Sequence, residues 1–185
     1  MIVSRELRKK NIAEYLLYMW QVEDLLRAND LSIEKVKSSL VESYNLAEEQ
    51  KRELTEWYEN LIEMMNIEDV KENGHLQINR NVIIMLTDLH LRLLKSPKVP
   101  FYTAAYYKVL PYIVEYRNKS NGREKSELEN CIDALYMVWM MKLQHRTINE
   151  ETLAATAEIT KFISMLSLYY SEEEAGRLDL ESEEV

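Results

Sequence analysis

The sequence predicts an all-α protein, a single-domain bundle of six to seven helices with an acidic C-terminal tail. Apolar residues recur at three- and four-residue spacing along most of the 185 residues, which is the period of an amphipathic helix. Only 3 Gly and 3 Pro are present, too few for the many tight turns of a β protein. Leu, Glu, Lys and Met, which all favour helices, are abundant.

The predicted helices follow one another with short breaks. Their approximate ranges are residues 4–28, 33–44, 46–72, 76–96, 100–118, 124–146 and 148–170. Turn and cap residues separate them: Asn29-Asp30, Ser32, Asn73-Gly74, the segment SPKVP at residues 96–100, Asn121-Gly122, and a capping box of Thr147 and Glu150. The third helix has a one-sided apolar stripe and should be peripheral. The first and sixth are apolar nearly all round, so we expect them at the centre.

We assign residues 1–170 to the bundle and residues 171–185 to a disordered tail. The tail holds seven acids and one Arg, so it contributes −6 to the net charge of −9. Such a segment is too charged to form a core, and a solvated tail is favoured over docking through Leu178 and Leu180. The remaining −3 leaves no basic stripe to neutralise phosphates, which argues against a nucleic-acid partner.

The expected location is the cytoplasm. Cys131 is the only cysteine, so no internal disulfide can form, and an inert core thiol is expected there rather than a nucleophile. The N-terminal segment MIVSRELRKKN turns basic where a secretion signal would turn apolar. The longest uncharged apolar run, residues 134–141, is far shorter than the roughly 20 residues that span a bilayer.

The seventh predicted helix has small, uncharged residues opposite its apolar stripe, where Lys and Glu would be usual. The interface candidates are Thr156, Thr160, Ser164 and Ser167. Small residues allow close helix approach, so this face is either a subunit interface of a homo-oligomer or a neutral exposed surface.

Two ionisable residues fall within apolar stripes. Glu23 lies in the stripe of the first helix and His90 in that of the fourth. A buried carboxylate must be paired, protonated or near the bundle edge. The plain interpretation is a Glu23 that reaches water or Arg27 and a satisfied core His90. The alternative is a buried Glu23–His90 pair acting as an acid/base couple.

Five tyrosines crowd the fifth predicted helix, and Tyr102 and Tyr106 project inward. Pro111 should kink this helix. With Glu23 and His90, these phenols would line a small-molecule pocket between the first, fourth and fifth helices, or they serve as amphipathic fillers.

No motif indicates a metal or a cofactor. The single Glu-x-x-His match, Glu72 to His75, is interrupted by a helix stop, and we treat it as chance. Three glycines cannot build a phosphate-binding loop.

The segments NIAEYLLYMWQVEDLLRA and GHLQINRNVIIMLTDLHLRLL resemble a family of helical proteins from Bacteroidetes-type bacteria, classed as a domain of unknown function. The resemblance implies one bacterial cytoplasmic domain without an assigned activity or functional residues. The leading hypothesis is a non-catalytic binding or scaffolding module, with a homodimer as one form of it. The alternative is a small-molecule-binding protein or enzyme.

Overall fold

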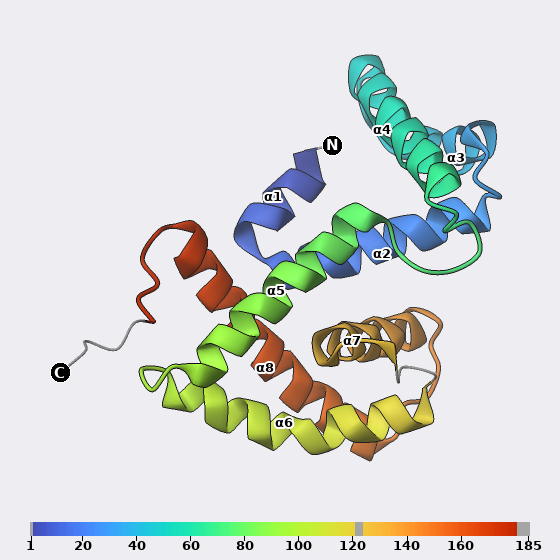
Figure 1. Cartoon of the computed structure of the whole chain (residues 1–185). Helices are drawn as coiled ribbons and strands as arrows, with labels where there is room; N and C mark the ends of the chain where they lie inside the picture. Colours follow the sequence, from blue (N-terminus) through green and yellow to red (C-terminus); the bar gives the residue numbers. More distant parts are fainter. Residues whose placement is uncertain (1, 121–123, 181–185) are drawn as a thin grey trace.

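A computed structural model describes residues 2–120 and 124–180, and within these ranges the protein is all-α (Figure 1). The all-α prediction is confirmed, since the described residues contain no strand. The elements are α1 (Ile2–Lys10), α2 (Ile12–Ala28), α3 (Ile33–Ser39), the 3₁₀ turn η1 (Val41–Ser43), α4 (Glu48–Ile67), α5 (Gln77–Lys95), α6 (Pro100–Lys119), α7 (Glu127–Leu143) and α8 (Glu150–Glu174). The predicted break at Asn121-Gly122 lies outside the described residues.

The first predicted helix is in fact two, which raises the helix number to eight among the described residues. Asn11 has extended backbone angles, and its side chain accepts hydrogen bonds from the N–H groups of Ala13 and Glu14. An asparagine that bonds its own neighbouring backbone competes with the continuous helix and starts a new one. The apolar period runs through Asn11 unchanged, so it does not reveal this break.

Two other helix starts test the cap assignments. Ser32 caps α3 as predicted, by accepting from the N–H of Lys35. The predicted capping box of Thr147 is wrong, because Asn149 is the N-cap of α8 and accepts from Thr152. Asparagine and threonine both suit this position, and the pattern alone does not separate two caps that lie so close together.

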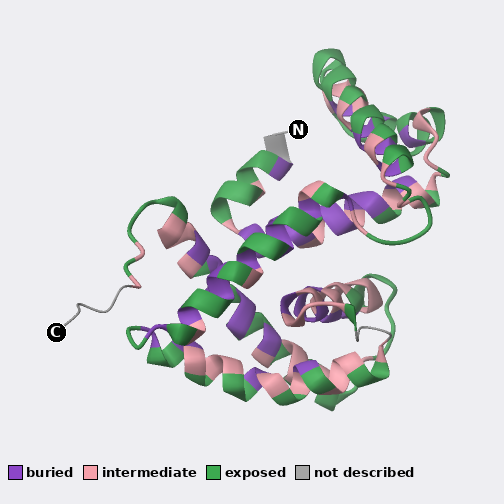
Figure 2. Ribbon diagram, in the orientation of Figure 1, coloured by how far each residue is buried: buried purple, intermediate pink, exposed green. Residues whose placement is uncertain are grey.

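The main body of the fold is built around α2 and α8. Helix α2 packs against α1, α5, α7 and α8, and α8 packs against α2, α5, α6 and α7. Figure 2 shows buried positions concentrated where α2, α5 and α8 meet. The expectation that α2 is central holds, but α7 is buried on one side only. Met137 is 44% exposed and Leu143 52% exposed on its outer side.

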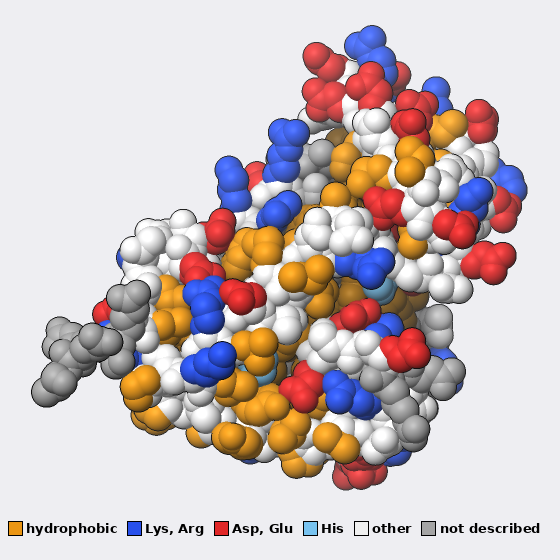
Figure 3. Space-filling view, in the orientation of Figure 1, with side chains coloured by type: hydrophobic (Ala, Val, Ile, Leu, Met, Phe, Trp, Pro, Cys, Tyr) orange, Lys and Arg blue, Asp and Glu red, His pale blue; other side chains and the backbone are white. Residues whose placement is uncertain are grey.

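The α3–α4 hairpin projects from the C-terminal end of α2, and α4 packs chiefly against α3 and η1 (Figure 1). Its buried residues form the predicted single stripe: Leu54, Tyr58, Leu61, Ile62 and Met65. Acidic side chains gather over this hairpin at the top of the space-filling view, whereas apolar side chains collect over α6 and the adjacent end of α5 (Figure 3). The hairpin is therefore peripheral, as the stripe predicts.

The chain after α8 returns to the bundle. Helix α8 continues to Glu174, four residues beyond the predicted boundary. Leu178 and Leu180 then pack against the core, and the Ser96 hydroxyl donates to the carbonyl of Leu180 at 3.1 Å. Docking, the less favoured alternative, is thus found up to residue 180. Residues 181–185 lie outside the described residues, and the predicted disorder of the tail stays a prediction there.

Among the residues described, none of the helices has the combination of length and hydropathy needed to cross a membrane.

Candidate functional site

The most unusual side chain of the core is the carboxylate of Glu23, on α2. It is 0% exposed and accepts three hydrogen bonds. His75 Nδ1 lies 2.7 Å from one carboxylate oxygen, and the Leu76 backbone N–H (3.0 Å) and Asn79 Nδ2 (2.7 Å) donate to the other. A buried carboxylate is tolerated only with such donors, because nothing else replaces its lost hydration.

These donors all lie where the loop from α4 enters α5. Leu76 is the N-cap residue of α5 and has no side chain able to cap it. Glu23 therefore places a carboxylate at the positive end of α5 from a neighbouring helix, where the helix dipole favours negative charge. The N–H of Gln77, the first residue of α5, donates to the Glu68 carboxylate at 2.6 Å. Two acids from outside the helix thus take the place of a capping residue in its own sequence.

Aromatic rings surround the carboxylate. The Trp20 and His75 rings stack with centroids 4.0 Å apart and an interplanar angle of 12°, and Tyr136 meets Trp20 edge-on. The Tyr15 hydroxyl donates to Asn79 Oδ1 at 3.2 Å. Burial raises the pKa of Tyr15, with an opposing contribution from Arg8 and a smaller supporting one from Glu23. The phenol therefore stays protonated and able to donate.

The loop that carries His75 is fixed by Arg27. Its guanidinium donates to the carbonyls of Val70 (3.1 Å) and Gly74, and pairs with Asp24 at 2.8 Å. Asp24 in turn accepts from the Tyr136 hydroxyl at 2.6 Å. One chain of contacts thus joins α2, the α4–α5 loop and α7.

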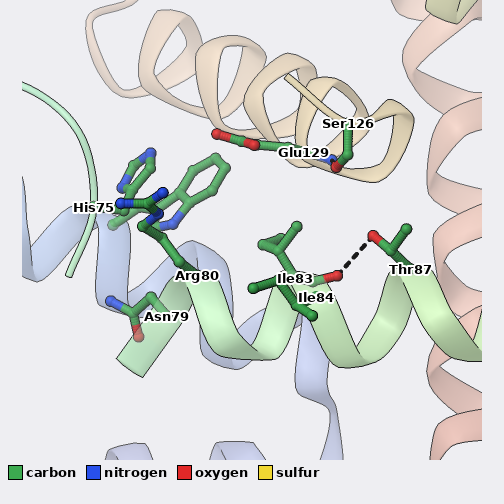
Figure 4. Close-up of a pocket in the computed structure, with 9 residues that line it drawn as sticks. His75, Asn79, Arg80, Ile83, Ile84, Thr87, Ser126 and Glu129 are labelled. Atoms are coloured by element: carbon green, nitrogen blue, oxygen red, sulfur yellow. Dashed lines mark hydrogen bonds between the residues drawn. The ribbon is translucent and has the colours of Figure 1, made fainter. Parts of the chain in front are cut away.

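A pocket of about 260 Å³ opens beside this network, between α2, α5 and the start of α7 (Figure 4). Its lining residues are Trp20, His75, Asn79, Arg80, Ile83, Ile84, Thr87, Ser126 and Glu129. Figure 4 shows the α5 residues on one wall, Ser126 and Glu129 on the α7 wall opposite, and His75 at one end. The Thr87 hydroxyl donates to the carbonyl of Ile83 within α5, at 2.8 Å.

The pocket contains unused polar capacity. With Nδ1 directed at Glu23, His75 keeps Nε2 without a hydrogen-bond partner among the described residues. The indole N–H of Trp20 also has no acceptor in the described part of the chain, but it is buried and is not open to the pocket. Such a donor costs about 1–3 kcal/mol relative to a satisfied one. The free Nε2 of His75 suits hydrogen bonding to a ligand, whereas no group of three or more His, Cys, Asp or Glu in the described ranges could hold a metal.

The favoured prediction for Glu23 is wrong, because its side chain is 0% exposed and Arg27 binds Asp24 and two loop carbonyls instead. The alternative, a Glu23–His90 couple, is not formed either. Asn79, which binds Glu23, and His90 are separated by eleven residues of α5, or about 16 Å along the helix. His90 Nδ1 instead lies 2.7 Å from the Tyr102 hydroxyl. Tyr106 and Phe162 pack edge-on against the same imidazole. A helical stripe shows which residues face inward but not which partners they meet.

None of the four predicted pocket residues lines the pocket. Glu23 supports its wall from behind, and Tyr102 is a core filler with 0% exposure. Tyr106 donates to Glu127 at 2.9 Å, and burial, followed by this hydrogen bond, raises its pKa to about 12. Cys131 is buried, which raises the pKa of its thiol well above the ordinary range, as expected for an inert core residue.

The interface candidates on α8 divide into two groups. Thr160 and Ser164 are exposed and Thr156 is half-buried, but Ser167 is only 7% exposed and faces the bundle. Ser167 is therefore not available to a partner. The Thr156 and Thr160 hydroxyls donate to carbonyls of their own helix, one turn earlier.

Sequence reasoning missed Trp20, His75 and Asn79. His75 was considered only as a metal ligand, whereas its partner is a carboxylate 52 positions earlier in the chain. Asn79 offers a usable signal, because it is a polar residue in phase with the apolar positions Val82, Leu86 and Leu93 of α5.

Comparison with protein-family models gives a match over most of the chain. A protein-family model described as "Domain of unknown function (DUF4924)" matches residues 1–177. The resemblance to a domain-of-unknown-function family is thereby confirmed. No curated protein and no solved structure matches the chain.

Glu23→Ala should lower the free energy of unfolding by about 3 kcal/mol or more, because two buried donors, Leu76 and Asn79, and the partly buried His75 lose their acceptor. Glu23→Gln should cost less, since its amide oxygen can still accept from Leu76 and Asn79. Urea denaturation measures both values. Glu56→Ala, at an exposed position of α4, is the control and should cost under about 1 kcal/mol. A Glu23→Ala protein as stable as the wild type would contradict the role of this network.

His90 should make stability depend on pH. Burial lowers its pKa below the ordinary 6.5, with a smaller opposing contribution from Glu127. The unfolded chain therefore binds a proton at His90 more readily than the folded chain does. The contribution of neutral His90 to the free energy of unfolding is complete above pH 6.5 and is lost as the pH falls below it. His90→Gln keeps a partner for Tyr102 and should flatten the decline between about pH 6.5 and 5, measured by urea titrations. His145→Gln, at an exposed site, should leave the slope unchanged; equal slopes for all three proteins would refute the assignment.

Proposed function

The chain belongs to the family described as Domain of unknown function (DUF4924), and we propose that it binds a small molecule in the pocket between α2, α5 and α7. The observation that carries this proposal is the buried Glu23–His75–Asn79 network directly behind the pocket wall. Binding, rather than catalysis, is the activity proposed.

A buried network such as that of Glu23 has a cost as well as a benefit for stability. Replacing a buried charged network with apolar side chains of similar volume is often neutral or stabilising. Stability alone therefore gives little reason to bury Glu23. Its hydrogen bond fixes the orientation of the His75 ring, which also stacks on Trp20 at the pocket. Preorganised polar groups of this kind are what a binding site needs.

The pocket has the composition of a ligand site. Apolar side chains from Trp20, Ile83 and Ile84 combine with a few polar groups that converge from three elements. A volume of about 260 Å³ lies just below the range of roughly 300–1,000 Å³ for drug-sized ligands, so the ligand should be a small metabolite.

The setting expected from the sequence is part of the same proposal. A bacterial cytoplasmic protein would keep Cys131 reduced, and its burial is compatible with that environment.

Filling the pocket should abolish binding without unfolding the protein. Thr87→Phe places a ring in the cavity at the loss of one hydrogen bond within α5, whereas Met85→Phe changes an exposed position of the same helix that does not line the pocket. Screening a mixture of small metabolites by ligand-observed NMR should reveal binding to the wild type and to Met85→Phe, but not to Thr87→Phe. Thermal unfolding of all three proteins checks that they fold. Equal binding to all three proteins, or binding to none, would rule the pocket out.

A second candidate function is protein binding through α6 and α8, as in a homodimer. Exposed, uncharged residues form a ridge along α8: Leu153, Ala157, Thr160, Ser164 and Leu168. Leu168 is 68% exposed, and Phe101 at the start of α6 is 82% exposed. Phe101 directly precedes Tyr102, and Leu168 directly precedes Tyr169. Because the rings of these two tyrosines lie 5.6 Å apart, Phe101 and Leu168 lie at a similar height along the bundle. Large exposed apolar residues on two helices that pack against each other favour a partner.

Leu168→Glu should then weaken self-association, because a charge would have to be buried against the second subunit. Sedimentation velocity over a concentration series should give a dimer for the wild type and at least a roughly tenfold higher dissociation constant for the variant. Ile67→Glu is a matched control, since Ile67 is 76% exposed but lies on the α3–α4 hairpin. A wild-type monomer at every concentration would eliminate the homodimer.

A further inference from the structure

We infer that the ligand of the pocket between α2, α5 and α7 is a small zwitterion with an apolar body, of the class of α-amino acids with hydrocarbon or aromatic side chains. This inference rests on the proposed function and specifies its ligand class. It follows from the charges, the apolar wall and the size of the pocket.

The pocket carries one charge of each sign on opposite walls. Arg80 extends from α5 and Glu129 from α7 (Figure 4). Arg80 forms no ion pair within 4 Å in the described part of the chain, and Glu129 reaches only Lys125, at 3.9 Å. The two charges therefore do not neutralise each other across the cavity.

This charge pattern selects against ligands of a single sign. An anion would pair with Arg80 but would be repelled by Glu129, and a cation would meet the reverse situation. A molecule with a carboxylate and an ammonium group satisfies both walls at once. The guanidinium offers the bidentate geometry that carboxylates prefer, and the Glu129 carboxylate accepts from an ammonium group.

The rest of the lining suits an apolar body. Ile84 is 61% exposed at the pocket, which leaves apolar surface for a ligand to cover, and Ile83 and Trp20 continue this wall. The Ser126 and Thr87 hydroxyls and the free Nε2 of His75 add neutral hydrogen-bonding groups that tolerate either end of the ligand.

Other ligand classes fit less well. A nucleotide or sugar phosphate carries at least one doubly charged group, yet the lining offers one guanidinium and an opposing carboxylate. Longer peptides separate their two terminal charges by more than one residue, whereas the cavity of about 260 Å³ is small. In a free α-amino acid, the ammonium group and the carboxylate are both bonded to the same carbon atom, so the two charges lie close together.

The test titrates the full chain with L-phenylalanine and L-leucine in a calorimeter. Each is compared with two derivatives that keep the side chain but lose one charge, the N-acetyl amino acid and the amino-acid amide. At least one of the two amino acids should bind, and each of its single-charge derivatives should bind at least about tenfold more weakly. Thr87→Phe should abolish the signal.

Two charge-removing variants locate the ends of the ligand. Arg80→Gln should lose most of the preference for the amino acid over its amide, and Glu129→Gln should lose most of the preference over its N-acetyl form. Because these are ratios between ligands, partial unfolding of a variant would not reproduce them. Arg52→Gln and Glu56→Gln, at exposed positions on α4, remove the same charges outside the pocket and should retain both preferences.

The outcomes separate the two proposals. If single-charge derivatives bind as well as the amino acids, or if the amino acids fail while other metabolites bind in a Thr87→Phe-sensitive manner, the zwitterion inference is wrong and the pocket function stands. If no small molecule shows Thr87→Phe-sensitive binding, both proposals are wrong.

Discussion

The desolvation of the Glu23 carboxylate is the constraint on which the centre of this protein depends. A charge with 0% exposure is compatible with folding only while its donors stay in place. Those donors come from the last loop residues before α5 and from its first turn. The position of α5 relative to α2 is therefore fixed at one point by polar contacts, whereas apolar packing elsewhere would tolerate small shifts.

The hydrogen bonds of Glu23 and the pocket wall belong to one connected set of side chains. Glu23 orients His75, Trp20 packs on the His75 ring, and Tyr136 bridges from Trp20 to Asp24. The pocket wall thus consists of side chains whose rotamers are restricted by their neighbours. Restriction of this kind lowers the ordering cost of binding, which otherwise reduces the affinity for small ligands.

The sequence was sufficient for the fold class but not for the site. Helical periodicity identified the helices and the one-sided burial of α4, because burial acts on every turn of a helix. It missed the break at Asn11, since one side chain that bonds its own backbone leaves the apolar period intact. It also identified Glu23 as an unusual residue, but neither the favoured partners, water or Arg27, nor the alternative, His90, is the one found. Periodicity specifies direction around a helix axis, whereas the meeting of Glu23 with His75 depends on the path of a loop.

The limited packing of the α3–α4 hairpin has a consequence for motion. Because α4 packs chiefly against α3 and η1, the hairpin can open as a separate cooperative unit while the helices around α2 and α8 remain folded. The loop that follows the hairpin is held by Arg27, which donates to the carbonyls of Val70 and Gly74. Gly74 directly precedes His75. Opening of the hairpin would strain the hydrogen bonds of Arg27 to this loop before it disturbed the helices around α2 and α8. Amide-exchange rates in the loop would therefore show how strongly the hairpin is coupled to the core.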